Sequence, residues 1–199
     1  MTGDMNTTLF QWIHSGAGTR PVLDTFAILV AEGGPYLLII LFGMLWLTNN
    51  KKITLLEATE TAMIGLMTNQ LIGLFYFHPR PFMIGLGTPL FPHGPESSFP
   101  SDHATFMFAA TFYLLTAGGL ATSAWALLLL TALTAWARVY SGVHFPFDMA
   151  GSLVVGLTST WLMRWLTPSL RPWNTKLLQI SEQFLPPFFR TKGQDTKKQ

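Results

Sequence analysis

Long apolar runs separated by short polar stretches dominate this chain of 199 residues. A helix needs about 20 mostly apolar residues to span the hydrocarbon core of a bilayer. Five runs come close to this length, and Gly and Ala recur in them, which favours close packing of helices in lipid. The hydropathy pattern therefore predicts five transmembrane helices. They cover about 25–47, 55–77, 102–118, 120–140 and 146–166.

The two ends of the chain differ from these runs. Residues 1–20 contain a short apolar patch but no charged n-region and no small-residue cleavage site. They predict a short interfacial helix rather than a cleavable signal peptide. Residues 167–199 are polar, basic and interrupted by proline, and they predict a cytoplasmic interfacial segment that ends in a disordered tail at 190–199. The prediction is thus one membrane domain at 1–166, followed by this segment.

Composition supports a polytopic membrane helix bundle. Apolar residues make up 49% of the chain and charged residues 11%, whereas soluble domains have about 25% charged residues. So few charges could not cover a large core with a wettable surface, which argues against a soluble protein. The absence of cysteine excludes disulfides and thiolate metal sites. A net charge of only +2, without a basic stripe, argues against nucleic-acid binding.

The distribution of Lys and Arg predicts the orientation, because positive charges are enriched on the cytoplasmic side of a membrane. Of the 12 Lys and Arg residues, all but Arg20, Arg80 and Arg138 fall on the side of the C-terminus. This asymmetry places the C-terminus in the cytoplasm and, with five spans, the N-terminus outside. The loops at 78–101 and 139–145 then lie together on the outer face.

Both predicted outer loops carry ionisable residues in short motifs. The first loop begins FHPRPF and ends SSFPSDH, and the second reads ARVYSGVHFPFD. Because both loops lie on one face, the motifs predict a single polar site there. The candidate site residues are His78, Arg80, Ser101, Asp102, His103, Arg138, His144 and Asp148.

The residue types in these motifs suit phosphoryl transfer. Two guanidinium groups offer forked donors for phosphate oxygens, and a cap at Ser101 leaves backbone N–H groups facing an anion. His144 and Asp148 are four residues apart, so a helix opened by Pro146 can bring the carboxylate to the imidazole. An acid that holds one ring nitrogen makes the other a better nucleophile. The set predicts a phosphohistidine and requires neither a metal nor another cofactor.

Each residue taken alone also has an ordinary structural explanation. An arginine beside a membrane interface is usually an anchor, and a serine before a helix is usually only a cap. Asp102 suits a first helical turn simply as a charge. His14 and His93 are assigned to loop or interface, and His78 fits either explanation. The functional interpretation therefore depends on the spacing within and between the motifs.

The order RPF, PSDH and R-x5-H-x3-D resembles the type 2 phosphatidic acid phosphatase superfamily, which shares its site with the vanadium haloperoxidases. The motifs span residues 80–148, and the pattern of runs extends the resemblance over about 25–166. The segments FHPRPF, SSFPSDHATF and WARVYSGVHFPFDMAG look like bacterial undecaprenyl-diphosphatases of the bacitracin-resistance type. The resemblance implies a multi-pass protein of the bacterial plasma membrane with its site on the periplasmic face.

The resemblance also implies a role for each matching residue. His144 would attack the terminal phosphorus, Asp148 would orient His144 and stabilise its charge, and His103 would protonate the leaving oxygen. The residues expected to hold the phosphoryl oxygens are Arg80, Arg138 and Ser101, with Asp102 and His78 as further candidates.

Three positions depart from the general family pattern. The family's Lys, seven residues before the first motif Arg, is Gly73 here, so one phosphate-binding cation is missing or is replaced by His78. The usual Gly of PSGH is Asp102, and the Ser often found before the second Arg is Ala137. The first two departures favour the undecaprenyl-diphosphatase branch over phosphatidate phosphatases.

Three functions stay open. The first is hydrolysis of undecaprenyl diphosphate to undecaprenyl phosphate and phosphate, which recycles the lipid carrier of cell-wall precursors; variants act on other lipid phosphates or transfer the phosphate to lipid A. The second is a small membrane transporter, although mid-span polar residues are few: Glu32, Asn69 and Gln70. The third is a non-catalytic scaffold, disfavoured because the motif residues are all retained. The predicted partners are the polyprenyl diphosphate and the bilayer, with no nucleic acid and no obligatory protein partner.

Overall fold

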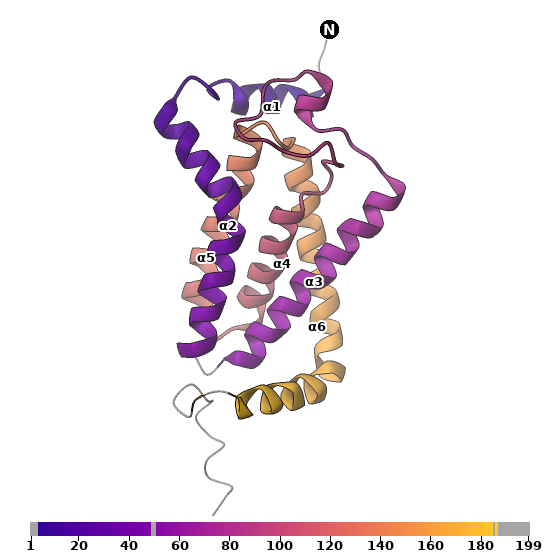
Figure 1. Cartoon of the computed structure of the whole chain (residues 1–199). Helices are drawn as coiled ribbons and strands as arrows, with labels where there is room; N and C mark the ends of the chain where they lie inside the picture. Colours follow the sequence, from indigo (N-terminus) through magenta and orange to yellow (C-terminus); the bar gives the residue numbers. More distant parts are fainter. Residues whose placement is uncertain (1–3, 49–50, 185, 187–199) are drawn as a thin grey trace, which may run out of the picture.

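The structure is a computed structural model that describes residues 4–48, 51–184 and 186. Within these residues all regular structure is helical, which confirms the all-α prediction. The predicted disordered tail at 190–199 lies outside the described residues. The elements, shown in Figure 1, are α1 (Met5–His14), α2 (Pro21–Thr48), α3 (Lys52–Phe75), η1 (Pro81–Ile84), α4 (Asp102–Ala117), α5 (Ala121–Tyr140) and α6 (Pro146–Gln183).

Local sequence signals set the ends of the helices that carry the predicted motifs. Ser101 is the N-cap of α4, where its hydroxyl accepts a hydrogen bond from the Ala104 N–H at 3.5 Å. Pro146 opens α6 at a position where a missing N–H breaks no helical hydrogen bond. Both motifs therefore lie at helix N-termini, next to the loops that precede them.

Helix α4 lies at the centre of the bundle and packs against α3, α5 and α6, while α2 packs mainly on α5 (Figure 1). Small residues allow close approach between these helices. A Cβ added at Gly156 of α6 would lie 2.8 Å from the Cβ of Phe108 and 3.0 Å from the Ala109 nitrogen of α4. The α4–α6 contact therefore requires glycine at this position.

The connections alternate between the two ends of the bundle. The loop between α3 and α4 and the loop between α5 and α6 lie at the same end, and α1 runs across that end (Figure 1). His14 of α1 holds this arrangement, because its Nδ1 lies 2.8 Å from the carbonyl oxygen of Tyr140 at the end of α5. The two motif-bearing loops are thus brought together by the up-and-down course of the helices.

Helix α6 continues beyond the predicted boundary at residue 166, through Pro168 and Pro172, and its last part turns aside at the far end of the bundle (Figure 1). Polar side chains hold this part against α3. Asn174 donates to Glu60 at 2.8 Å, and the buried Lys52 and Glu182 form an ion pair at 3.1 Å. The segment after residue 166 therefore begins as a docked helical extension.

The prediction of five transmembrane helices is not confirmed. Among the described helices, only α2 and α5 are long and apolar enough to cross a membrane by length and composition. Helix α4 has 16 residues, fewer than the about 20 that span a bilayer, and the acids Glu57 and Glu60 lower the hydropathy of α3. Large apolar side chains are nevertheless exposed on the other helices, including Phe75 (89%) and Trp161 (72%).

Candidate active site

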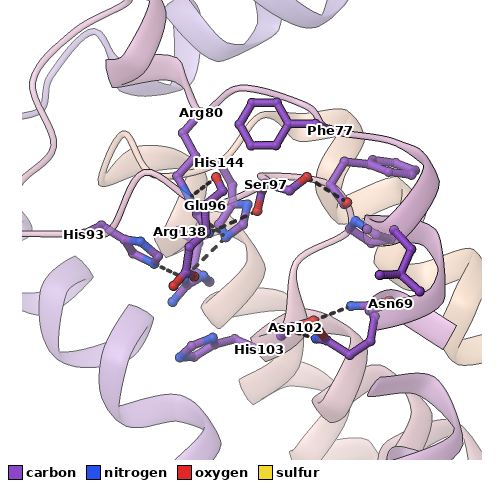
Figure 2. A pocket seen from close by; sticks show the side chains of 15 residues that line it. Asn69, Phe77, Arg80, His93, Glu96, Ser97, Asp102, His103, Arg138 and His144 are labelled. Carbon is purple, nitrogen blue, oxygen red and sulfur yellow. Dashed lines mark hydrogen bonds between the residues drawn. The ribbon is translucent and has the colours of Figure 1, made fainter. Parts of the chain in front are cut away.

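A cavity of about 520 Å³ lies at the end of the bundle where the two motif-bearing loops meet (Figure 2). Its wall combines basic, amide, acidic and apolar side chains from α3, the two loops, α4 and α5. Of the eight predicted site residues, five line it: Arg80, Asp102, His103, Arg138 and His144. The motifs separated along the chain therefore share one cavity.

His144 lies at the centre of this arrangement, and its two ring nitrogens have different partners. Nδ1 lies 2.9 Å from the carbonyl oxygen of Ser98 and 3.3 Å from a carboxylate oxygen of Asp148. Both partners are acceptors, so Nδ1 carries the proton and donates it. Nε2 then presents its lone pair, and it accepts from Arg80 at 3.1 Å and from Arg138 at 3.3 Å. The lone pair on Nε2 thus faces two guanidinium groups.

The charge state of His144 agrees with this geometry. The side chain is buried, at 2% exposure, and burial lowers the pKa of His144 to about 3. The neighbouring Arg138 and Arg80 lower this pKa further, whereas Asp148 opposes the change. His144 is therefore a neutral imidazole near pH 7, which is the state in which Nε2 can act as a nucleophile.

Backbone carbonyl groups hold both guanidinium groups in place. Arg80 donates to the carbonyl oxygens of Val143 at 2.9 Å, Glu96 at 3.2 Å and Ser97 at 3.3 Å. Arg138 donates to the carbonyl oxygen of Ala31, on α2, at 3.1 Å. Neither arginine is held by a carboxylate in these contacts, so both keep their full positive charge for an anion in the cavity.

Asp148 lies behind His144 rather than in the cavity wall. One carboxylate oxygen accepts the Phe145 N–H at 2.7 Å and also accepts from the hydroxyl of Ser98. The same oxygen faces His144 Nδ1 across the first turn of α6. The carboxylate is fully buried, and its contacts with Phe145 and Ser98 fix its position beside the imidazole.

Ser101 and His78 are the two other predicted residues that do not line this cavity. Ser101 is buried and its side chain caps α4. His78 lines a second cavity, of about 500 Å³, on the other side of Phe99, where its Nδ1 lies 3.3 Å from Asp148. His78 therefore lies in a different cavity from Gly73, the position of the missing family lysine.

The contact between His78 and Asp148 predicts a pH-dependent contribution to stability. The carboxylate raises the pKa of His78 above 6.5, so the attraction is complete below the unfolded pKa and is lost as pH rises through the folded pKa. We expect His78→Gln to lower the melting temperature by about 2 °C near pH 5.5 and by almost nothing near pH 9. Thermal unfolding in detergent at both pH values measures this, and an equal loss at both would contradict it.

Several cavity residues do not belong to the motifs. His93, which the sequence assigns to loop or interface, accepts from Arg138 through Nε2 at 3.1 Å, and its ring lies edge-on to His144 (Figure 2). Burial and the two arginines lower the pKa of His93, so it is a neutral acceptor for Arg138. The only signal that could have identified His93 is its position between two motifs in one loop.

Two amides of α3 also reach the cavity. Asn69 donates to one carboxylate oxygen of Asp102 at 2.8 Å, and Gln70 lies 3.4 Å from the other. The sequence places Asn69 and Gln70 among mid-span polar residues, but in the structure both line the cavity next to the first residue of α4, Asp102. Figure 2 shows Asn69 beside Asp102. Within the described part of the chain, no group of three or more His, Asp or Glu side chains could hold a metal ion.

Comparison with known proteins agrees with this geometry. Residues 54–172 match the family model described as the PAP2 superfamily. The chain is 34% identical over 183 residues to undecaprenyl-diphosphatase BcrC of Bacillus subtilis (strain 168), covering 91% of this chain and 94% of that one. It is 33% identical over 165 residues to YbjG of Escherichia coli (strain K12), covering 79% and 80%.

The fold agrees as well. The crystal structure of Aquifex aeolicus LpxE superposes with a TM-score of 0.68 and 27% identity, covering 81% of this chain and 96% of that chain. The matched family segment runs from α3 into α6 and contains every motif residue that lines the cavity. The chain belongs to the PAP2 superfamily.

Proposed function

We propose that the protein is a membrane lipid diphosphatase that hydrolyses undecaprenyl diphosphate to undecaprenyl phosphate and phosphate through a phosphohistidine at His144. The observation that carries this proposal is the orientation of the His144 ring. Its Nδ1 is held by Ser98 and Asp148, and its Nε2 faces Arg80 and Arg138. A phosphoryl group bound by the two arginines would lie directly in front of the nucleophilic nitrogen.

In the first step, Nε2 of His144 attacks the terminal phosphorus, and the bond from phosphorus to the bridging oxygen breaks. His103, in the same cavity wall, enters this step as an imidazolium, which the bound diphosphate anion favours, and gives its proton to the bridging oxygen of the departing lipid monophosphate. Arg80 and Arg138 stabilise the charge that spreads over the phosphoryl oxygens. Asp148 stabilises the positive charge that develops on the imidazole, because its carboxylate accepts a hydrogen bond from Nδ1–H while the proton stays on the ring.

In the second step, water attacks the phosphohistidine and releases phosphate. His103 takes a proton from this water, because the group that served as acid in the first step is left as a base. The phosphorus–nitrogen bond breaks, and His144 returns to its neutral state with Nδ1 still protonated. The two steps together consume one water and need no redox partner.

The choice of a polyprenyl diphosphate rests on the site and on the relatives. The BcrC relative in Bacillus subtilis is named an undecaprenyl-diphosphatase. The cavity has room for a diphosphate, and its lining includes the apolar side chains of Leu74, Phe77 and Phe99 beside the polar ones. A lipid with a diphosphate headgroup and an apolar tail matches this combination of polar and apolar lining. The reaction would recycle the carrier of cell-wall precursors.

The proposal places the bundle in the bacterial plasma membrane, with α2 to α6 embedded and the cavity on the periplasmic face. The basic residues Lys51, Arg171 and Lys176 belong to the opposite end, where the positive-inside rule puts the cytoplasm. The last part of α6 would lie at that interface, since Trp173 and Leu177 are exposed while Asn174 is buried.

A transporter is less well supported than an enzyme. Asn69 and Gln70 line the cavity at one end of the bundle, together with the motif residues. Glu32 lies exposed on α2. A transporter would instead place polar groups along its full depth.

The purified protein should distinguish the substrates and the acceptor. We expect free phosphate to appear from undecaprenyl diphosphate with a kcat/KM at least about tenfold above that for phosphatidate or a lipid A phosphate, because only the diphosphate fills the polar wall. Free phosphate and phosphorylated lipid are measured in the same reaction, with lipid A added as acceptor. Faster turnover of phosphatidate, or phosphate found only on lipid A, would contradict the proposal.

A further inference from the structure

Helix α2 reaches the active site although it precedes the segment matched by the family model, residues 54–172. The contact is made by Arg138, whose Nη1 donates to the backbone carbonyl oxygen of Ala31 at 3.1 Å. Arg138 and Ala31 are both buried, at 2% and 0% exposure. A carbonyl group in the middle of a helix normally accepts from the N–H four residues later.

Proline explains why this carbonyl group is free to accept. Four residues after Ala31 is Pro35, which lies inside α2 and has no N–H. The helical hydrogen bond to the Ala31 carbonyl oxygen therefore cannot form. An unpaired carbonyl group in an apolar interior is unfavourable, and the guanidinium group of Arg138 supplies the missing donor.

The packing of α2 on α5 brings the arginine to this carbonyl group. Thr134, one turn before Arg138 on α5, lies with its hydroxyl 3.4 Å from the carbonyl oxygen of Val30. A Cβ added at Gly34 would lie 2.1 Å from this hydroxyl, so the approach requires glycine there. Two neighbouring carbonyl groups of α2 thus receive two side chains from one face of α5.

We propose that Pro35 is a positioning residue for the phosphate site, because it leaves the Ala31 carbonyl oxygen free to hold the guanidinium group of Arg138. With Nη1 engaged by Ala31, Nη2 is directed at His144 Nε2, at 3.3 Å, and at His93 Nε2, at 3.1 Å. The Ala31 carbonyl group thereby orients the arginine before an anion enters the cavity. This inference depends on the phosphate-binding role of Arg138 in the proposed function.

The test replaces Pro35 with alanine. The new N–H at position 35 competes with Arg138 for the Ala31 carbonyl oxygen and closes the normal helical hydrogen bond. We expect orthovanadate, a phosphate analogue, to bind about tenfold more weakly, and kcat/KM for the lipid to fall by a similar factor, as for loss of one hydrogen bond to a charged group. The melting temperature should stay the same or rise, because alanine favours a helix interior over proline.

Two comparisons separate positioning from a general structural effect. Pro172→Ala removes a helix-internal proline from the exposed part of α6, far from the cavity, and should leave vanadate binding and turnover unchanged. In an Arg138→Ala background, Pro35→Ala should cause no further loss of vanadate affinity, because the side chain through which it acts is gone.

Unchanged vanadate affinity in Pro35→Ala, or the same loss with and without Arg138, would overturn the inference. Direct titration with vanadate needs no lipid, so it tests the positioning role even if the protein does not hydrolyse undecaprenyl diphosphate. Vanadate binding that depends on Pro35, together with no release of phosphate from that lipid, would reject the proposed function and keep the inference.

Discussion

Replacing His144 with alanine is expected to abolish phosphate release from undecaprenyl diphosphate, with a loss of at least about a thousandfold in kcat. The reason is geometric. His93 and His103 also line the cavity, but only His144 has one ring nitrogen held by a carboxylate and a carbonyl group while the other faces both arginines. No neighbouring imidazole is arranged to take its place as nucleophile.

Phosphate release from a purified variant measures this prediction, and a rapid-quench experiment with substrate labelled at the terminal phosphate adds a second readout. The wild-type protein should carry acid-labile label on histidine, and His144→Ala should carry none. His14→Ala is a control for lost packing at the same end of the bundle, because His14 lies outside the cavity and contacts the Tyr140 carbonyl group; its turnover is compared per folded protein, as measured by thermal unfolding. Near-wild-type turnover in His144→Ala would eliminate the phosphohistidine mechanism.

The positions of several helices could be predicted from the sequence, because local signals mark where these helices begin and end. The apolar run at 120–140 and the PSDH motif correspond closely to α5 and to the start of α4. The end of α6 could not be predicted in this way, because two prolines within it argue for a break. What keeps the helix docked is long-range pairing such as that of Lys52 with Glu182, which no local pattern reveals.

The candidate site shows the same division between local and long-range information. The four-residue spacing between His144 and Asp148 and the caps at helix N-termini are local, and they predict which groups can meet. His93 has no such spacing, because it lies in a loop rich in proline and glycine. Its contact with Arg138 joins residues that are 45 positions apart in the sequence, so only the folded chain brings them together. The support of Arg138 by α2 is likewise a product of helix packing.

Ser101 illustrates the limit of motif reasoning. As a helix cap and as a phosphate ligand it would occupy the same position in the sequence, and the structure uses its hydroxyl as the cap. His78 is similar, because a histidine two residues before Arg80 could face either cavity. In the structure its ring packs on Tyr76 and Phe145 and lies beside Asp148. Residue type and spacing therefore predict the chemistry, and packing decides which side chains line the cavity.

Asp148→Asn is expected to reduce kcat by about a thousandfold while leaving the fold intact. Asparagine has nearly the same shape, so the first turn of α6 can persist. Its amide, however, carries no charge to balance the imidazole as Nε2 bonds to phosphorus. If the amide nitrogen faces His144, it donates to Nδ1, which moves the ring proton to Nε2 and removes the nucleophilic lone pair.

The Ser98 carbonyl group should preserve some turnover in the Asp148→Asn variant. It accepts from Nδ1 of His144 at 2.9 Å independently of residue 148, so some molecules keep the productive tautomer. Turnover by Asp148→Asn should therefore be low but measurable, above that of His144→Ala. Steady-state kinetics in detergent gives both values, and thermal unfolding checks the fold.

Asp24→Asn provides the matched control, since Asp24 accepts from the Tyr140 hydroxyl at 2.8 Å outside the cavity and should be dispensable for turnover. If Asp148→Asn retained more than about a tenth of wild-type kcat, the carboxylate would not be needed to balance the charge on the imidazole. The Ser98 carbonyl group alone would then suffice to orient His144. A loss confined to KM would instead show that Asp148 acts on substrate binding rather than on the chemical step.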